Sequence, residues 1–141
     1  MTDNIDRTRD QFEAFDRKDV DAIVASYRDD AVLTDHAAQQ TAKGPAEIRE
    51  YYEAQFAFSS DQATAGLEIM ASEDWTIIRG LLRGTHDGPL AGVEPTGRRF
   101  EGSYCNLVRW EDGKAVEDHV YYDLYSLLAQ LGQVPPLTAS A

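Results

Sequence analysis

The order of the predicted elements constrains the fold more than any other feature of the sequence, because helical patterns come first and strand patterns follow. Apolar residues recur at helical spacing in residues 4–17, 19–27 and 43–56. After Ser60 the pattern changes to strands, in residues 63–71, 75–85, 98–110 and 114–123. Most connections between these strands are turns too short for a parallel crossover. This order predicts an α+β domain in which a curved antiparallel sheet wraps around the N-terminal helices.

Local signals support these segments. Asp19 can cap the second helix, and Pro45 suits the first turn of the third. The second helix carries apolar residues at i, i+3, i+4 and i+7, namely Val20, Ile23, Val24 and Tyr27. Asp112-Gly113 predicts a hairpin turn, and residues 124–132 predict a final helix. A sheet curved into a cone has a mouth, where we expect a pocket for a small molecule.

The composition of the chain limits the kinds of partner that we expect it to bind. A formal net charge of -12 disfavours nucleic acid and anionic membrane surfaces, which both attract clustered Lys and Arg. The polar start of the chain predicts neither a signal peptide nor a membrane span, and the single Cys105 fits a reducing compartment. We therefore expect a cytoplasmic protein forming one domain over residues 1–141, with a core at about 4–132.

The stretch "RDDAVLTDHA" ends in a carboxylate followed by an imidazole. Because alternate side chains of a strand share a face, Ala31, Leu33 and Asp35 lie together and His36 lies opposite. If Leu33 packs inward, Asp35 also points inward, and a carboxylate in apolar surroundings is a competent base near neutral pH. The alternative is an aspartate that accepts backbone N–H bonds in a turn.

Asn106 is the second candidate, as a polar residue within the mainly apolar face of "FEGSYCNLVRW". A buried amide needs hydrogen-bond partners. It can donate to a substrate carbonyl and stabilise an enolate, or it can bond a neighbouring strand inside the core.

Two histidines complete the candidate catalytic set. His86 precedes a long glycine-rich loop, which can act as a lid, and His86 can either anchor this loop or reach the substrate. His119 shares a face with Tyr121, whereas Asp118 shares the other face with Val120. The sequence leaves open which face lines the pocket. Nothing in the spacing of the histidines and the cysteine predicts a metal site, and no cofactor motif is present, so we expect neither.

Longer motifs suggest a family. "DVDAIVASYRDDAVLTD" with "KGPAEIREYY" resembles the first half of ketosteroid isomerase and its nuclear-transport-factor-2-like relatives. "RGTHDG", "PTGRR" and "EDGKAVE" are similar to the SnoaL-like polyketide cyclases, also called ester cyclases. The resemblance implies a cone-shaped α+β barrel, a homodimer and a deep apolar pocket.

The resemblance also bears on individual residues. It implies that Asp35 is the proton-transferring aspartate of the isomerases, and that Asn106 stands where they carry a protonated aspartate and the cyclases a histidine. Two positions depart from the pattern. Gln11 or a neighbour replaces the first-helix tyrosine of the isomerases, and Val120 replaces the last-strand aspartate of the cyclases.

These observations favour a cofactor-free cyclase or isomerase that removes a proton next to a carbonyl in a small hydrophobic, polyketide- or steroid-like substrate. A non-catalytic module that binds an apolar molecule in the same pocket is the first alternative. A dimeric scaffold with a filled core is the second.

Overall fold

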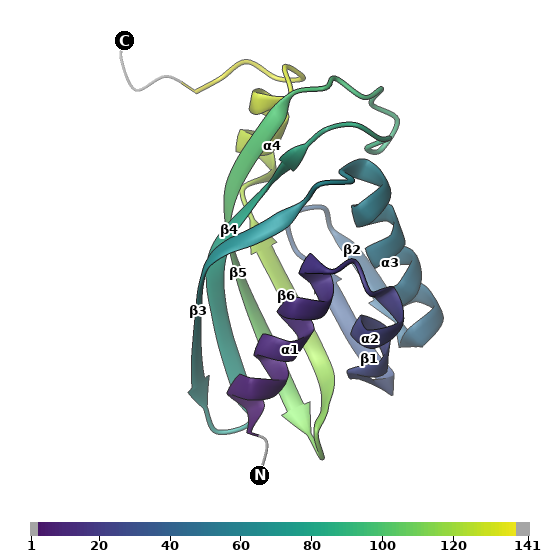
Figure 1. The fold of residues 1–141 in the computed structure, drawn as a ribbon, viewed down its shortest axis with the longest axis vertical. Coiled ribbons are helices and arrows are strands. Elements are labelled where there is room, and N and C mark those ends of the chain that lie inside the picture. Colours follow the sequence, from purple (N-terminus) through teal and green to yellow (C-terminus); the bar gives the residue numbers. More distant parts are fainter. Residues whose placement is uncertain (1–2, 138–141) are drawn as a thin grey trace.

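The computed structural model describes residues 3–137 and confirms the α+β fold class. A six-stranded sheet has the order β2-β1-β6-β5-β4-β3 and is curved but not closed. Figure 1 shows this sheet bending around the three N-terminal helices, with α4 at one end of the sheet. No helix in the described part of the chain is long and apolar enough to cross a membrane.

Three of the helices within residues 3–137 begin at an aspartate that caps them, and α3 begins without a side-chain cap. They are α1 (Asn4–Asp16), α2 (Val20–Ala25), α3 (Gly44–Phe58) and α4 (Leu124–Gln130). The carboxylate of Asp19 accepts a hydrogen bond from the backbone N–H of Ala22 at 3.1 Å, and Pro45 lies in the first turn of α3. Helix α2 ends two residues earlier than the apolar spacing predicts, because Ser26 forms its C-cap and Tyr27 already belongs to a strand.

The strands are β1 (Tyr27–Asp35), β2 (Gln40–Lys43), β3 (Ala63–Ser72), β4 (Trp75–Thr85), β5 (Arg99–Glu111) and β6 (Lys114–Tyr122). All neighbouring pairs are antiparallel except β1 and β6, which are parallel. Short turns predict antiparallel neighbours only for strands adjacent in sequence. Since most of the chain lies between β1 and β6, the rule does not apply to this pair, and their parallel pairing could not be predicted from it.

The core lies between the concave face of the sheet and the helices. Its fully buried members come from α2, α3 and four strands, and include Ile23, Leu33, Ile48, Ile78 and Val108. A second cluster of Phe58, Phe100 and Leu131 packs near α4. Between these two clusters the side chains leave space, and the candidate site occupies it.

Candidate active site

A cavity of about 310 Å³ opens among α1, α3, α4 and the concave face of the sheet. Its lining is mainly aromatic and aliphatic, with Phe12, Phe15, Tyr52, Leu82, Phe100 and Leu127 among its members. This volume is at the lower end of the range for small-molecule sites. Polar side chains also face it, among them Asp35, Asn106 and Asp118, and these can orient a ligand.

Asp35 ends β1 and lines this cavity, although its exposed fraction is only 1%. Ala31 and Leu33 on the same face of the strand are also buried, in keeping with the alternation in the sequence. Three donors hold the carboxylate. The backbone N–H of Ala38 donates to Oδ1 at 2.8 Å, and the hydroxyls of Tyr51 and Tyr122 donate to Oδ2 at 2.8 and 3.0 Å. Asp35 therefore combines the two arrangements considered for it. One of its oxygens accepts a backbone N–H in a turn, and the side chain also faces the cavity.

The two tyrosines that hold Asp35 remain neutral donors. Burial, followed by the nearby charge of Asp35, raises the pKa of Tyr51 and of Tyr122 above the ordinary value. Tyr51 comes from α3 and Tyr122 from the end of β6. No pattern in the sequence pointed to this pair, because their meeting depends on the packing of α3 and on the register of β6.

Asn106 lies on β5 and also lines the cavity. Its register partner on β6 is Val120, which is in turn the register partner of Asp35 on β1. The Oδ1 atom of Asn106 is buried and has no hydrogen-bond partner within residues 3–137. Because buried amides are nearly always hydrogen-bonded, an unpaired Oδ1 calls for a ligand donor, and the Nδ2 of the same amide is the atom that can donate to a ligand.

Asp118 is a second buried carboxyl in the lining, on the same face of β6 as Val120. The hydroxyl of Tyr27 donates to its Oδ2 at 2.5 Å. Since this hydrogen is committed, the hydroxyl of Tyr52 is the donor in its 2.8 Å bond to Tyr27. The structure thus answers the open question about β6: its Asp118–Val120–Tyr122 face lines the cavity.

His86 is fully buried at the end of β4 but does not line the cavity. Its Nδ1 accepts the backbone N–H of Thr96 at 3.2 Å and lies 3.0 Å from the hydroxyl of the same residue. The loop between β4 and β5 is therefore tied at its base, and its residues Pro89, Leu90 and Ala91 line the cavity. Of the two roles considered for His86, these contacts with Thr96 favour the loop anchor.

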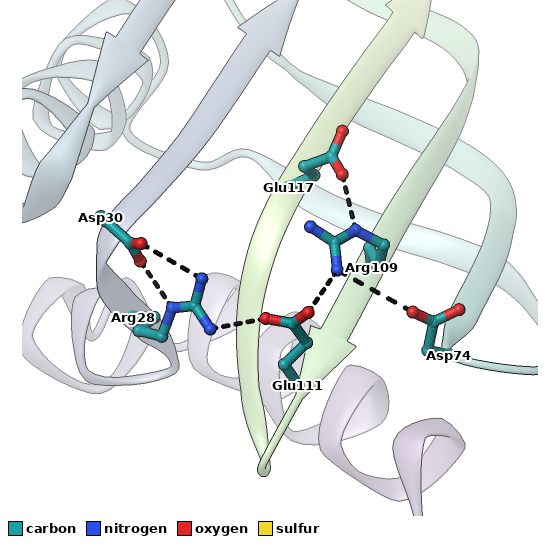
Figure 2. A network of polar contacts seen from close by, with 6 residues as sticks. All are labelled: Arg28, Asp30, Asp74, Arg109, Glu111 and Glu117. Atoms are coloured by element: carbon teal, nitrogen blue, oxygen red, sulfur yellow. Dashed lines mark hydrogen bonds and ion pairs between the residues drawn. The ribbon is translucent and has the colours of Figure 1, made fainter.

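His119 projects from the opposite face of β6, away from the cavity. Its Nδ1 lies 2.9 Å from Nε2 of His36, and its Nε2 lies 3.3 Å from a carboxylate oxygen of Glu117. Glu117 also accepts a hydrogen bond from Arg109 at 2.6 Å, in the network of charged side chains that Figure 2 shows. The structure therefore brings Asp35 and Asn106 to one cavity and leaves His119 in a polar network on the outer face.

The family follows from comparison with known proteins. The sequence profile of the SnoaL-like polyketide cyclases matches residues 6–131. The chain belongs to this family. The curated "Aklanonic acid methyl ester cyclase AcmA" from Streptomyces galilaeus is 33% identical over 81 residues, or 57% of this chain and 56% of that protein. The chain thus spans little more than half the length of this curated relative.

Solved structures share the fold. AclR from Streptomyces galilaeus, described as a putative hydroxylase, is 26% identical with a TM-score of 0.83, over 94% of this chain and 83% of that one. IdmH from Streptomyces antibioticus, described as a putative polyketide cyclase, is 28% identical with a TM-score of 0.78, over 91% of this chain and 97% of that one. Since these two carry different descriptions, the fold alone does not define a reaction.

Proposed function

We propose that this protein is a cofactor-free cyclase that closes a ring in a small polyketide-like substrate after removing a proton next to a carbonyl. Asp35 is the general base, and Asn106 is the donor that stabilises the enolate oxygen. The curated relative is named as a cyclase of aklanonic acid methyl ester, which supports this class of substrate.

The observation that carries the proposal is the row formed by Asp35, Val120 and Asn106 across three neighbouring strands of the cavity wall. A base and a hydrogen-bond donor lie on either side of a valine that exchanges no protons. A substrate over Val120 can present its C–H to Asp35 and its carbonyl oxygen to Asn106.

The chemistry follows from these positions. Removing a proton from the carbon next to a carbonyl moves negative charge onto the carbonyl oxygen, and a donor aimed at that oxygen stabilises the transition state. Polyketide chains carry several carbonyl groups, so the enolate carbon can attack a second carbonyl of the same molecule and close a ring. The apolar lining keeps the reacting carbon away from water.

Binding without catalysis is the second candidate function, and two residues favour it. Val120 occupies the position where the resemblance implies a catalytic aspartate, and Gln11 replaces a tyrosine. The side-chain Nε2 of Gln11 donates to the hydroxyl of Ser26 at 2.7 Å, so it is already occupied. Under this alternative the same cavity binds an apolar ligand and does not convert it into a product.

A homodimer is part of the proposal. The outer face of the sheet carries apolar side chains along one row of register partners, the exposed Met70 and the half-buried Ile77 and Leu107, with the exposed Tyr121 on the same face. Met70 is 50% exposed on β3 and Tyr121 is 41% exposed on β6, and large exposed side chains of this kind on one face of a sheet mark a candidate interaction surface. A second copy of the chain would cover this surface.

Incubation with aklanonic acid methyl ester tests the proposal, with thermal shift reporting binding and mass spectrometry and NMR reporting a cyclised isomer of equal mass. We expect both a raised melting temperature and the isomer. Binding without any isomer, for this ester and for related polyketide esters, would favour the binding module and contradict the cyclase.

A further inference from the structure

The second carboxyl of the cavity, Asp118, has no role in the proton abstraction proposed above for Asp35 and Asn106. Its register partners are Leu33 on β1 and Val108 on β5, so it lies two residues along β6 from Val120. Two residues of a strand span about 7 Å. Asp118 therefore faces the same cavity from a neighbouring position of the wall, on the strand beside Asp35.

The two carboxyls differ in their hydrogen bonds. Both oxygens of Asp35 have donors, whereas Asp118 has one donor, Tyr27, on Oδ2. The Oδ1 atom of Asp118 is buried and finds no partner among the described residues. Leaving a buried polar atom unpaired destabilises a protein, so an unpaired oxygen in the wall of a cavity points to a ligand group that completes it.

The surroundings of Asp118 also suit proton exchange near neutral pH. Burial raises the pKa of Asp118 to about 6, against the opposing effects of the Tyr27 hydrogen bond and the nearby His119. Because Tyr27 occupies Oδ2, with Tyr52 donating to Tyr27 in turn, the proton of the neutral acid resides on Oδ1. A carboxyl with such a pKa can give up and regain a proton at little cost.

We propose that Asp118 is a further catalytic residue, the general acid that donates from Oδ1 to the carbonyl oxygen under attack. This role rests on the proposed cyclase function. Two carboxyls in contrasting environments commonly divide acid and base work between them. Here Asp35, whose two oxygens both accept hydrogen bonds, is the base, and Asp118, which has one oxygen without a partner in the described residues, is the acid.

The proposed ring closure moves one proton onto Asp35 and one proton off Asp118. Asp35 takes a proton from the carbon next to one carbonyl, and the resulting enolate carbon forms a C–C bond to the second carbonyl carbon. The π electrons of that second carbonyl move to its oxygen, which takes the proton of Asp118 and becomes a hydroxyl. The product is an isomer of the substrate. Asp35 then loses its proton to water, and Asp118 regains one from water.

The test uses the wild-type protein and decalin-1,5-dione, a fused bicycle with a carbonyl on each ring and hydrogens next to both. Carbon-detected NMR follows the titration of the Asp118 carboxyl with and without saturating diketone, and the exposed carboxyl of Asp112 is the internal control. A carbonyl that accepts the Asp118 proton favours the neutral acid. We therefore expect the midpoint of Asp118 to rise by about one pH unit or more on binding, and that of Asp112 to stay constant.

The variant Tyr27→Phe adds a second readout. Losing the hydrogen bond to Oδ2 removes support for the ionised form, so the midpoint of Asp118 should rise already without the diketone. A midpoint for Asp118 that is unchanged by the diketone would overturn the inference.

Exchange of the diketone α-hydrogens for solvent deuterium, recorded in matched D2O samples, separates this inference from the proposed function. Exchange with a stationary Asp118 midpoint overturns the role of Asp118 and leaves Asp35 as the base. A raised Asp118 midpoint without exchange supports the carbonyl contact and contradicts the proton abstraction.

Discussion

Asp35 and Asn106 face the cavity from opposite sides of Val120, each as the register partner of that valine on a neighbouring strand. With strands about 4.8 Å apart, the backbones of the two residues are about 10 Å apart, and their side chains converge on the space above the valine. Under the proposed function, a flat carbonyl compound would place its acidic C–H at one of these residues and its oxygen at the other. Val120, where the resemblance implies a carboxylate, therefore leaves the proposed base and donor in place.

Asn106→Ala should lower the rate of α-hydrogen exchange without unfolding the protein. Its Oδ1 atom accepts no hydrogen bond in the described residues, so the substitution removes none there. The loss of its Nδ2 donor to an oxyanion costs on the order of 100- to 1000-fold in rate. NMR exchange measurements on decalin-1,5-dione in D2O check this. The variant Asn106→Gln keeps an amide in a displaced position, so its exchange rate should lie between those of the wild type and Asn106→Ala. An exchange rate in Asn106→Ala equal to that of the wild type would contradict the donor role.

Asp118 should make folding stability depend on pH. Its folded pKa of about 6 lies above the ordinary value of about 3.9, so the folded state binds the proton more tightly than the unfolded chain. The stabilisation is fully present below about pH 4 and is lost as pH rises through about 6, with a total of about 3 kcal/mol.

Urea unfolding of wild type and Asp118→Asn between pH 4 and 7.5 measures this effect. The free energy of unfolding of wild type relative to the variant should fall as pH rises through that window. Parallel pH profiles for the two proteins would show that Asp118 titrates normally.

His86→Phe should loosen the base of the loop between β4 and β5. Phenylalanine keeps the ring but removes the Nδ1 that accepts the backbone N–H of Thr96. A net hydrogen bond contributes about 1 kcal/mol, so the amide of Thr96 should exchange with solvent about fivefold faster. His86→Asn restores an acceptor near the Nδ1 position and should recover part of the protection. Equal exchange in all three proteins would exclude the loop anchor.

The outer face of the sheet should form a homodimer. Sedimentation at micromolar concentration is expected to give twice the chain mass of 15.7 kDa. Leu107→Glu places a charge within the exposed apolar row and should shift the protein to monomers, whereas Ala46→Glu on the exposed side of α3 should not. Sedimentation of the wild type as a monomer would rule the interface out.

Much of the fold could be predicted from the sequence because its signals are local. Caps such as Asp19, helical spacing and strand alternation each act within a few residues. Tyr27 shows the limit: it continues the apolar spacing of α2, yet Ser26 ends the helix and the residue enters β1.

The site depends on contacts between segments that are distant in the sequence, so only part of it could be predicted from the sequence. Alternation indicated the inward direction of Asp35, because Leu33 on the same face is a clear core residue. The hydroxyl of Tyr122 reaches Asp35 only because β1 and β6 pair in parallel in one register. That register also decides that Asp118 lines the cavity and His119 does not. A shift of one residue would exchange the two faces.

Asp35→Asn is the most direct test of the account. The amide keeps the shape of the carboxylate, and the hydroxyls of Tyr51 and Tyr122 can rotate to accept from its Nδ2, so the cavity should remain intact. Asp112→Asn, in an exposed turn, removes the same charge and is the matched control. The measurement is the rate at which each protein exchanges the α-hydrogens of decalin-1,5-dione for solvent deuterium. We expect a loss of roughly 100- to 10,000-fold in Asp35→Asn and an unchanged rate in Asp112→Asn. A rate in Asp35→Asn equal to that of the wild type would contradict the assignment of Asp35 as the base.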